Sequence, residues 1–149
     1  MGIDVGTVRV GISRSDSDGL LATPYETVAR SEDSSDYRRI AALVEEISAQ
    51  EIIVGLPLGL AGTATASTND ALHFAEQLNA LVSVPIRMVD ERLSTVSAAR
   101  ALRANGKSAR KSRSVIDQTA ATVILQLALD TERQTGSAPG EQLSSPREA

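Results

Sequence analysis

The hydrophobic pattern of this chain divides into short apolar runs and longer helical repeats, which together predict a mixed α/β fold. Residues 2–5 and 25–29 are short apolar segments, and apolar and polar residues alternate over 8–14. Such runs are typical of β-strands. Because short turns separate them, these three strands should form an antiparallel meander. Two further strands are predicted at 51–55 and 85–89, and the almost wholly apolar 51–55 is typical of the middle of a covered sheet.

Helices are predicted where apolar residues recur at i, i+3, i+4 and i+7. This repeat occurs in 34–47, where serines can cap its start, and again in 69–82. A short helix should cover 94–102, and a last helix should run from 114 to about 133. The order of these elements predicts an α/β layer architecture, with a five-stranded mixed sheet flanked by helices.

The length of the chain fits one domain. Its 149 residues can bury a single core but not two full ones. Residues 1–133 contain all the predicted elements and should form that domain. Residues 134–149 are rich in Ser, Pro, Gly and Glu and contain one Leu, so a disordered C-terminal tail is predicted there.

The composition excludes several kinds of site. The chain has no cysteine, which excludes a disulfide, a thiolate zinc site and a cysteine nucleophile. Only Tyr25, Tyr37 and Phe74 are aromatic, too few for the stacking platforms that bind single-stranded nucleic acid. No segment approaches the roughly 20 apolar residues of a membrane span, and no basic and apolar leader opens the chain. A cytoplasmic protein with no membrane partner is therefore expected.

Positive charge is concentrated in one stretch, although the net charge of the chain is -4. Nearly half of all Lys and Arg residues lie between 92 and 113, and no Asp or Glu interrupts them. A local cluster of one sign attracts phosphate whatever the net charge. The stretch is therefore either a solvated face or a nucleic-acid-binding surface. The candidate binding residues are Arg92, Arg100, Arg103, Lys107, Arg110, Lys111 and Arg113.

Acidic residues occur where the pattern predicts buried structure. Asp4 lies within the first strand, Asp90 and Glu91 follow the fifth, and Asp117 begins the apolar face of the last helix. Ligands of α/β sheets gather at the carboxyl ends of strands, so these acids are expected to converge. Asp117 alone has a second explanation, because an acid in the first helical turn is stabilised by the helix dipole. Three carboxylates without clustered Cys or His suit hard cations, so Mg²⁺ or Mn²⁺ is the predicted cofactor, and such ions serve phosphodiester cleavage.

Four motifs follow one another along the chain. They are GIDVGT with RVG at 2–11, IIVGLPL at 52–58, DERLST at 90–95 and, in 116–126, IDQTAA followed by ILQ. Together they closely resemble the YqgF (RuvX) family, and the resemblance covers essentially residues 2–129. It implies an RNase H-like fold. It also implies one of two activities described for that family, maturation of the 5′ end of precursor 16S ribosomal RNA or resolution of Holliday junctions.

The resemblance also assigns residues by matching position. It implies that Asp4, Glu91 and Asp117 are the catalytic and metal-binding acids, which selects Glu91 over its neighbour Asp90. The expected function is a metal-dependent nuclease, a hydrolase acting on ester bonds, with precursor rRNA as its partner in ribosome biogenesis. The alternative is a Holliday junction resolvase acting on branched DNA. A resolvase would need two active sites and hence a homodimer.

Two other protein classes share parts of this pattern. Actin-like kinases and chaperone ATPases also begin with a strand, Asp-x-Gly-Thr and a following glycine, but they close two domains around a nucleotide and this chain supplies one. A non-catalytic module would use 100–113 to bind RNA or the ribosome and keep its acids as remnants. Arg92 likewise has two interpretations: it neutralises Asp90, or it contacts the scissile phosphate.

Overall fold

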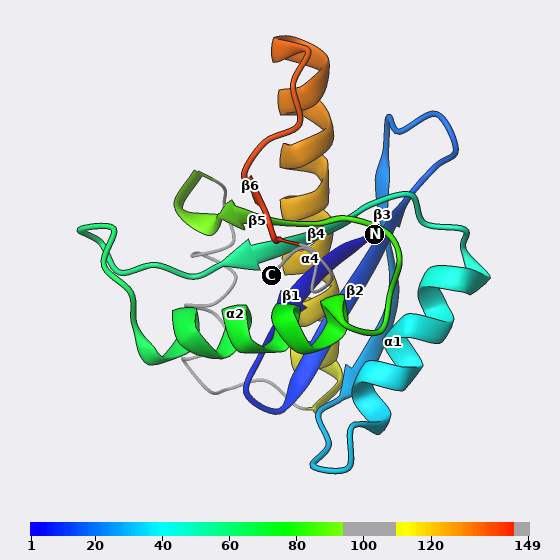
Figure 1. Cartoon of the computed structure of the whole chain (residues 1–149), viewed down its shortest axis with the longest axis vertical. Coiled ribbons are helices and arrows are strands. Elements are labelled where there is room, and N and C mark those ends of the chain that lie inside the picture. The colour runs from blue at the N-terminus through cyan, green and yellow to red at the C-terminus, as the bar shows by residue number, and fades with distance from the viewer. Residues whose placement is uncertain (94–109, 145–149) are drawn as a thin grey trace.

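The computed structural model describes residues 1–93 and 110–144, with side chains in the second range from residue 118 onward. This part of the chain forms one open sheet with helices on both faces (Figure 1). The predicted α/β layer architecture is confirmed. The predicted helix at 94–102 lies outside the described residues.

Six strands form the sheet, in the order β3-β2-β1-β4-β5-β6. β1 (Gly2–Val5), β2 (Arg9–Ser15) and β3 (Ala22–Ala29) form the predicted antiparallel meander. β4 (Ile52–Leu56) pairs with β1 in parallel, and β5 (Ile86–Asp90) pairs with β4 in parallel. The carboxyl ends of β1, β4 and β5 therefore lie at the same end of the sheet.

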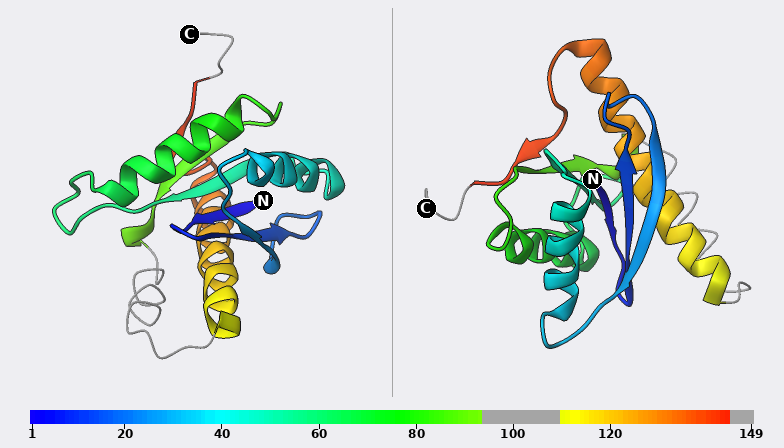
Figure 2. Two further views of the ribbon diagram at one scale, coloured as in Figure 1. Left: turned by 90° about the horizontal axis from the view of Figure 1, so that it is seen from below. Right: turned by 90° about the vertical axis from the view of Figure 1, so that its right-hand side faces the viewer.

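Helices cover the two faces of the sheet unequally. α1 (Ser35–Glu46) and α2 (Ala66–Asn79) pack on one face, and the long helix α4 (Arg110–Thr135) crosses the other (Figure 2). Each face has its own hydrophobic core. The two faces are therefore distinct environments, and a residue's place in a strand decides which of them it meets.

Strand alternation assigns residues to these two cores. Ile3 and Val5 are buried under α1 and α2, in the core that contains Phe74. Ile53 is buried under α4, together with Ile124 of that helix. Successive side chains of a strand point to opposite faces. Gly2, Asp4 and Gly6 therefore belong to the α4 face.

Helices α2 and α4 begin earlier than their periodicity predicted. α2 begins at Ala66 because Thr65 and Thr68 form a capping box. The Thr68 backbone N–H donates to the Thr65 hydroxyl (3.3 Å), and the Thr65 backbone N–H donates to the Thr68 hydroxyl (2.9 Å). α4 begins at Arg110, before the predicted start at 114. Among the described residues, no helix is long and apolar enough to cross a membrane.

A sixth strand, β6 (Glu141–Gln142), shows that the prediction of a disordered tail from residue 134 is wrong for the described part of that segment. The chain reverses through Gly136 and Gly140, both with φ of 77°, and β6 then pairs antiparallel with β5. The Leu143 backbone N–H extends this pairing by donating to the Ile86 carbonyl (2.9 Å). The sheet thus has six strands where five were predicted. Composition missed the sixth because backbone hydrogen bonds hold an edge strand, and almost any sequence can make them.

Candidate active site

Asp4 is a fully buried carboxylate on a central strand, with 0% of its surface exposed. It lies between Ile3 and Val5, which face α1 and α2, so its own side chain faces α4. In the antiparallel ladder its register partner is Gly11 of β2, which carries no side chain on that face. A buried carboxylate costs free energy unless hydrogen bonds or positive charge compensate it. This position is therefore more typical of a functional site than of a core.

Glu91 is the second buried acid, with 4% exposure, and it opens a short 3-10 turn, η1 (Glu91–Leu93), directly after β5. Its carboxylate lies over the backbone of Gly55. A Cβ placed on that glycine would be 2.6 Å from Glu91 Oε1. The absence of a side chain at residue 55 is therefore what lets Glu91 reach back across the sheet.

The register of β1 and β4 brings these two acids together. Ile3 pairs with Val54, so the next residues along, Asp4 and Gly55, lie side by side. Neighbouring strands are about 4.8 Å apart, so the Glu91 carboxylate lies over the strand position next to Asp4. The structure thus places both predicted acids on the α4 face, at the carboxyl ends of their strands.

α4 runs antiparallel to β1 across this face. Its Gln118 Nε2 donates to the Thr27 hydroxyl (2.9 Å) near the end of β3, and its Gln126 Oε1 accepts from the Ala22 backbone N–H (2.8 Å) at the start of β3. Thr27 is the register partner of Gly11, which is in turn the partner of Asp4. Residue 118 therefore lies level with the row of the sheet that contains Asp4.

Asp117 precedes Gln118 by one residue, so its backbone lies at the same level of the sheet as Asp4. By helical spacing it is one turn before the buried Ala121, on the stripe of α4 that packs against the sheet. The side chain of Asp117 is outside the described residues. Among the side chains that are described, no three acids or histidines cluster closely enough to hold a metal ion.

The chemistry of the described donors fits a hard cation. Asp4 and Glu91 supply oxygen ligands from a water-poor face, and the chain contains no cysteine to compete. Because Gly55 has no side chain, the Glu91 carboxylate has a fixed place over its backbone, beside Asp4. These two residues, with Asp117 as the predicted third, could hold Mg²⁺ or Mn²⁺.

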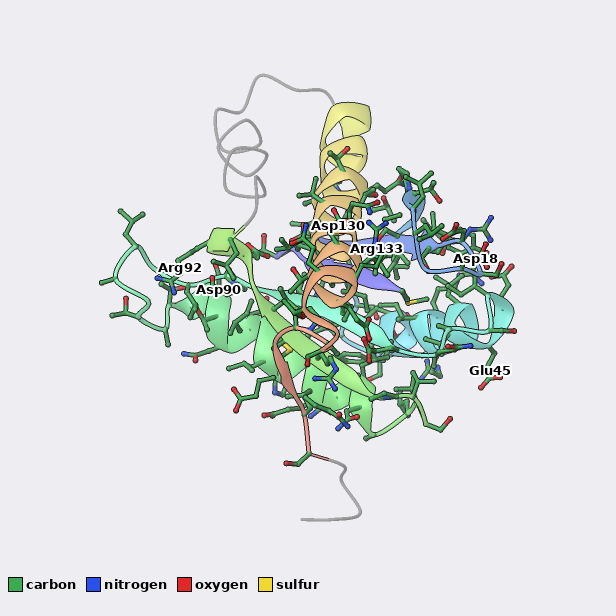
Figure 3. All side chains as sticks on the ribbon, turned by 90° about the horizontal axis from the view of Figure 1, so that it is seen from above. Asp18, Glu45, Asp90, Arg92, Asp130 and Arg133 are labelled. Carbon is green, nitrogen blue, oxygen red and sulfur yellow. The ribbon has the colours of Figure 1, made fainter. Side chains whose placement is uncertain are left out.

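Asp90 and Glu91 are adjacent in sequence but occupy different environments. Glu91 is buried, whereas the Asp90 side chain is 24% exposed and forms an ion pair with Arg92. Hydrogen bonds from the Arg92 guanidinium hold the pKa of the Asp90 carboxyl below its usual range. Figure 3 shows this pair at the opposite side of the molecule from Asp18 and Glu45. Of the two interpretations of Arg92, the structure thus contains the one in which it neutralises Asp90.

Arg30 is a site-supporting residue that the sequence analysis missed. Its Nη1 donates both to the Gly6 carbonyl (2.9 Å) and to Asp70 Oδ2 (2.7 Å), and its guanidinium lies 5.2 Å from the centre of the Phe74 ring. Hydrogen bonding from Arg30 lowers the pKa of the Asp70 carboxyl. Arg30 thus ties α2 to the turn that follows Asp4. No local motif marks this contact, because it joins three segments far apart in the chain.

The basic cluster is not tested by the described residues. Arg100, Arg103 and Lys107 lie in the range 94–109, and the side chains of Arg110, Lys111 and Arg113 precede residue 118. The cluster as a nucleic-acid surface therefore stays a prediction. Arg92 is the one member of the predicted set whose side chain is described, and it is held by Asp90.

Comparison with protein families gives a match over most of the chain. Residues 1–131 match the RuvX family, whose description is "Holliday junction resolvase". A protein of Leifsonia xyli subsp. xyli named "Putative pre-16S rRNA nuclease" is 64% identical over 140 residues, which cover 94% of this chain and 90% of that protein. A protein of the same name from Clavibacter michiganensis subsp. michiganensis is 57% identical over 141 residues, covering 94% and 88%.

Solved structures show the same fold at low sequence identity. Thermus thermophilus RuvC matches with a TM-score of 0.51 and 17% identity, covering 94% of this chain and 98% of RuvC. RuvC in complex with a Holliday junction substrate matches with a TM-score of 0.57 and 16% identity, over the same shares of the two chains. The predicted RNase H-like fold is therefore confirmed.

Proposed function

This chain belongs to the RuvX family, and we propose that it is a metal-dependent nuclease that acts in the 5′ maturation of precursor 16S ribosomal RNA. The observation that carries the proposal is the pair of buried carboxylates, Asp4 and Glu91, placed side by side at the carboxyl ends of two strands. The names of the relatives at 64% and 57% identity support precursor rRNA as the substrate. The kinase alternative lacks support, because the match covers a single domain of another family.

We assign the metal ligands to Asp4, Glu91 and Asp117. When bound, Mg²⁺ or Mn²⁺ in such a site activates water and stabilises the leaving oxygen of a phosphodiester. The protein's part is positioning. Asp4 is positioned by the central strand β1, and Glu91 by its packing over the backbone of Gly55. Asp117 is positioned by α4, which packs on the same face of the sheet.

We further propose that the basic stretch of the chain tracks the phosphates of the substrate. The residues assigned to this surface are Arg100, Arg103, Lys107, Arg110, Lys111 and Arg113. They follow Glu91 in the chain and lead into α4, so they connect two of the elements that carry the acids. Cytoplasmic precursor rRNA is a partner consistent with this charge. Phosphate contacts of this kind bind nucleic acids without regard to sequence.

Resolution of Holliday junctions is the second candidate function. The description of the RuvX family and the fold shared with RuvC favour it. Cutting a junction symmetrically requires two active sites, so this alternative includes a homodimer. Precursor rRNA maturation and junction resolution would use the same acid site, so the two functions are distinguished by their substrates.

One experiment tests the proposal: purified protein with Mg²⁺ or Mn²⁺ is offered a precursor 16S rRNA fragment and a four-way DNA junction side by side. We expect metal-dependent cleavage of the RNA, abolished by EDTA and by Asp4→Asn or Glu91→Gln. Both variants should stay folded, and Asp4→Asn should melt no lower than the wild type because it removes carboxylate repulsion.

Other outcomes discriminate among the alternatives. Cleavage of the junction alone would favour the resolvase, and its active species should be a dimer. Nucleic-acid binding that is indifferent to metal, with no cleavage of either substrate, would favour the non-catalytic module. Activity that survives EDTA, or wild-type cleavage by either variant, would contradict the metal-nuclease assignment.

A further inference from the structure

We propose that Asp90 and Arg92 form a latch that holds the β4–α2 loop, residues 57–65, beside Glu91, and that Arg92 is a positioning residue and not a phosphate ligand. The inference rests on the proposed nuclease function and adds to it. It assigns the loop as one side of the substrate site, already ordered before the substrate binds. It also explains why a basic residue stands directly after the catalytic acid.

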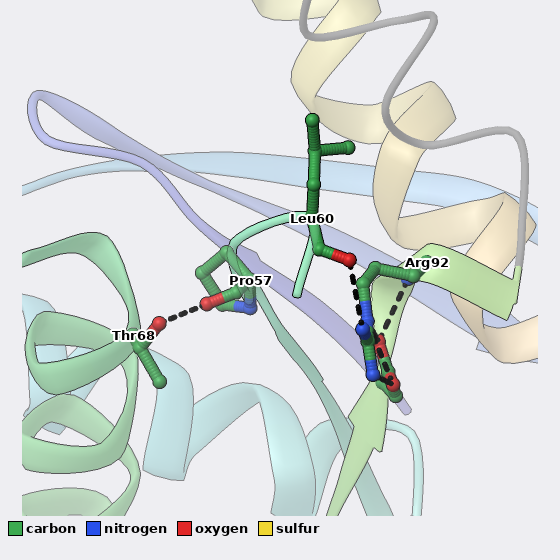
Figure 4. A network of polar contacts seen from close by, with 5 residues as sticks. Pro57, Leu60, Thr68 and Arg92 are labelled. Carbon is green, nitrogen blue, oxygen red and sulfur yellow. Dashed lines mark hydrogen bonds and ion pairs between the residues drawn. The ribbon is translucent and has the colours of Figure 1, made fainter. Parts of the chain in front are cut away.

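The guanidinium of Arg92 is engaged on two sides (Figure 4). Its Nη2 lies 2.7 Å from Asp90 Oδ2, and its Nε lies 3.1 Å from each Asp90 carboxylate oxygen. Its Nη1 reaches the Leu60 carbonyl at 3.5 Å and lies against Gly62. Gly62 has a φ of 78°, and a Cβ there would be 3.2 Å from Nη1. The loop therefore closes on Arg92 at a residue that only glycine suits well.

The loop is closed on itself and fixed at its far end. Gly59 donates its backbone N–H to the Thr63 carbonyl (2.8 Å), and Gly62 donates to the Gly59 carbonyl (2.8 Å). At the other end the Thr68 hydroxyl of α2 donates to the Pro57 carbonyl. A compact loop anchored by α2 at its base and by Arg92 at its tip is held in one place. The side chain of Leu60 at this tip is fully exposed.

Asp90 links the latch to the catalytic acid. Its Oδ1 also accepts the Arg92 backbone N–H at 2.9 Å, which shapes the η1 turn that contains Glu91. The same carboxylate thus sets the turn and neutralises the guanidinium. The Asp90–Arg92 pair carries no net charge, so it contributes little to counterion release on nucleic acid. Asp90 therefore contacts both the turn that contains Glu91 and the arginine that holds the loop.

The latch predicts that Asp90→Asn and Arg92→Gln have the same consequence. Asn keeps the oxygen that accepts the Arg92 N–H, so the turn survives while the ion pair is lost. Both variants should raise KM roughly fivefold and leave kcat within about twofold, because the loop loosens while Asp4 and Glu91 stay in place. The double variant should be no worse than either single one.

Two measurements separate the latch from a phosphate contact. Amide hydrogen exchange of Gly59 and Gly62, measured on the protein alone, should speed up in both variants. The salt dependence of RNA binding, measured in an Asp4→Asn background so that nothing is cut, should keep its slope. Arg133→Gln, which removes another exposed arginine paired with an aspartate, is the matched control and should change none of these values.

The proposal is overturned if Arg92→Gln lowers the slope of log K against log salt by about one unit while Asp90→Asn leaves binding unchanged or tightens it. It is also overturned if loop exchange is unchanged in both variants. The exchange measurement needs no substrate. A wild-type protein that cleaves nothing would therefore refute the proposed function while the latch is still tested.

Discussion

At the scale of single residues, two glycines on the α4 face set how closely the helix and Glu91 approach the sheet. A Cβ on Gly2 would lie 2.7 Å from the Ala121 carbonyl oxygen, and a Cβ on Gly55 would lie 2.6 Å from Glu91 Oε1. Contacts this short require something to move. The same absence of a side chain thus serves packing at one position and the candidate active site at the other.

Gly55→Ala should therefore impair both stability and catalysis. The added methyl overpacks the site against Ile124 and displaces the Glu91 carboxylate, which should cost about 1–3 kcal/mol of unfolding free energy and lower kcat by roughly tenfold or more. Thermal melting and single-turnover cleavage would measure the two effects. Gly2→Ala is the matched control, because it overpacks α4 without touching Glu91 and should lose stability while kcat of the folded protein is retained. Wild-type kcat in Gly55→Ala would argue that Glu91 does not act in the reaction.

Sequence identified Asp4 as a candidate because an acid between two apolar strand residues is costly to bury. It could not choose between Asp90 and Glu91 from pattern alone, and the choice came from family resemblance. The structure distinguishes them by burial and by the ion pair with Arg92. That distinction depends on the η1 turn and on the bare backbone of Gly55, which are properties of packed neighbours and not of local sequence.

At the scale of elements, the strands and helices that were predicted correctly are those with a clear apolar pattern. α1 buries one face against the sheet, so its apolar spacing is visible in the sequence, and β1 is buried along its whole length, so it is visible as a short apolar run. β6 has no such pattern, because both of its residues are exposed and its stabilisation comes from pairing with β5. Starts of helices were missed where capping or helical extension involves polar residues, as at Thr65.

The contact of Arg30 with Asp70 joins α2 to the turn after β1, and its contribution to stability should depend on pH. Arg30 lowers the pKa of Asp70, so the pair stabilises the folded state above the unfolded pKa and loses that effect as pH falls through the lower folded pKa. Because the Asp70 side chain is 35% exposed, the gain should be at most about 1 kcal/mol. Wild type should therefore be more stable than Asp70→Asn near pH 7, and the difference should shrink below about pH 4. Denaturant unfolding at several pH values measures this, and a difference that grows in acid would contradict it.

At the scale of the whole molecule, the described sheet is open, with the acids at one end of its strands and β6 along one edge. β6 pairs with Arg87 and Met88, and Glu91 lies beyond that pairing, past the end of β5. The side-chain amide of Asn79 in α2 also donates to the Ser144 carbonyl, so the segment after β6 reaches the helix layer. An uncovered edge strand exposes backbone groups that can pair with other chains. The C-terminal segment should accordingly protect the sheet without taking part in cleavage.

Two glycines that share a backbone conformation test this role. Gly136 and Gly140 both have a φ of 77°, so alanine at either position should cost about 1–2 kcal/mol in backbone strain. At Gly136 nothing lies within 4 Å of the added Cβ, whereas at Gly140 it would lie 2.2 Å from the Met88 carbonyl oxygen of β5. Gly140→Ala should therefore displace β6 and melt several degrees below Gly136→Ala, with faster exchange of the Leu143 amide and a greater tendency to aggregate. Below the melting transition both variants should cleave at the wild-type rate, since β6 does not reach Glu91. Equal melting temperatures would mean that β6 contributes nothing to the fold, and loss of cleavage in Gly140→Ala alone would mean that the edge of the sheet and the acid site are coupled.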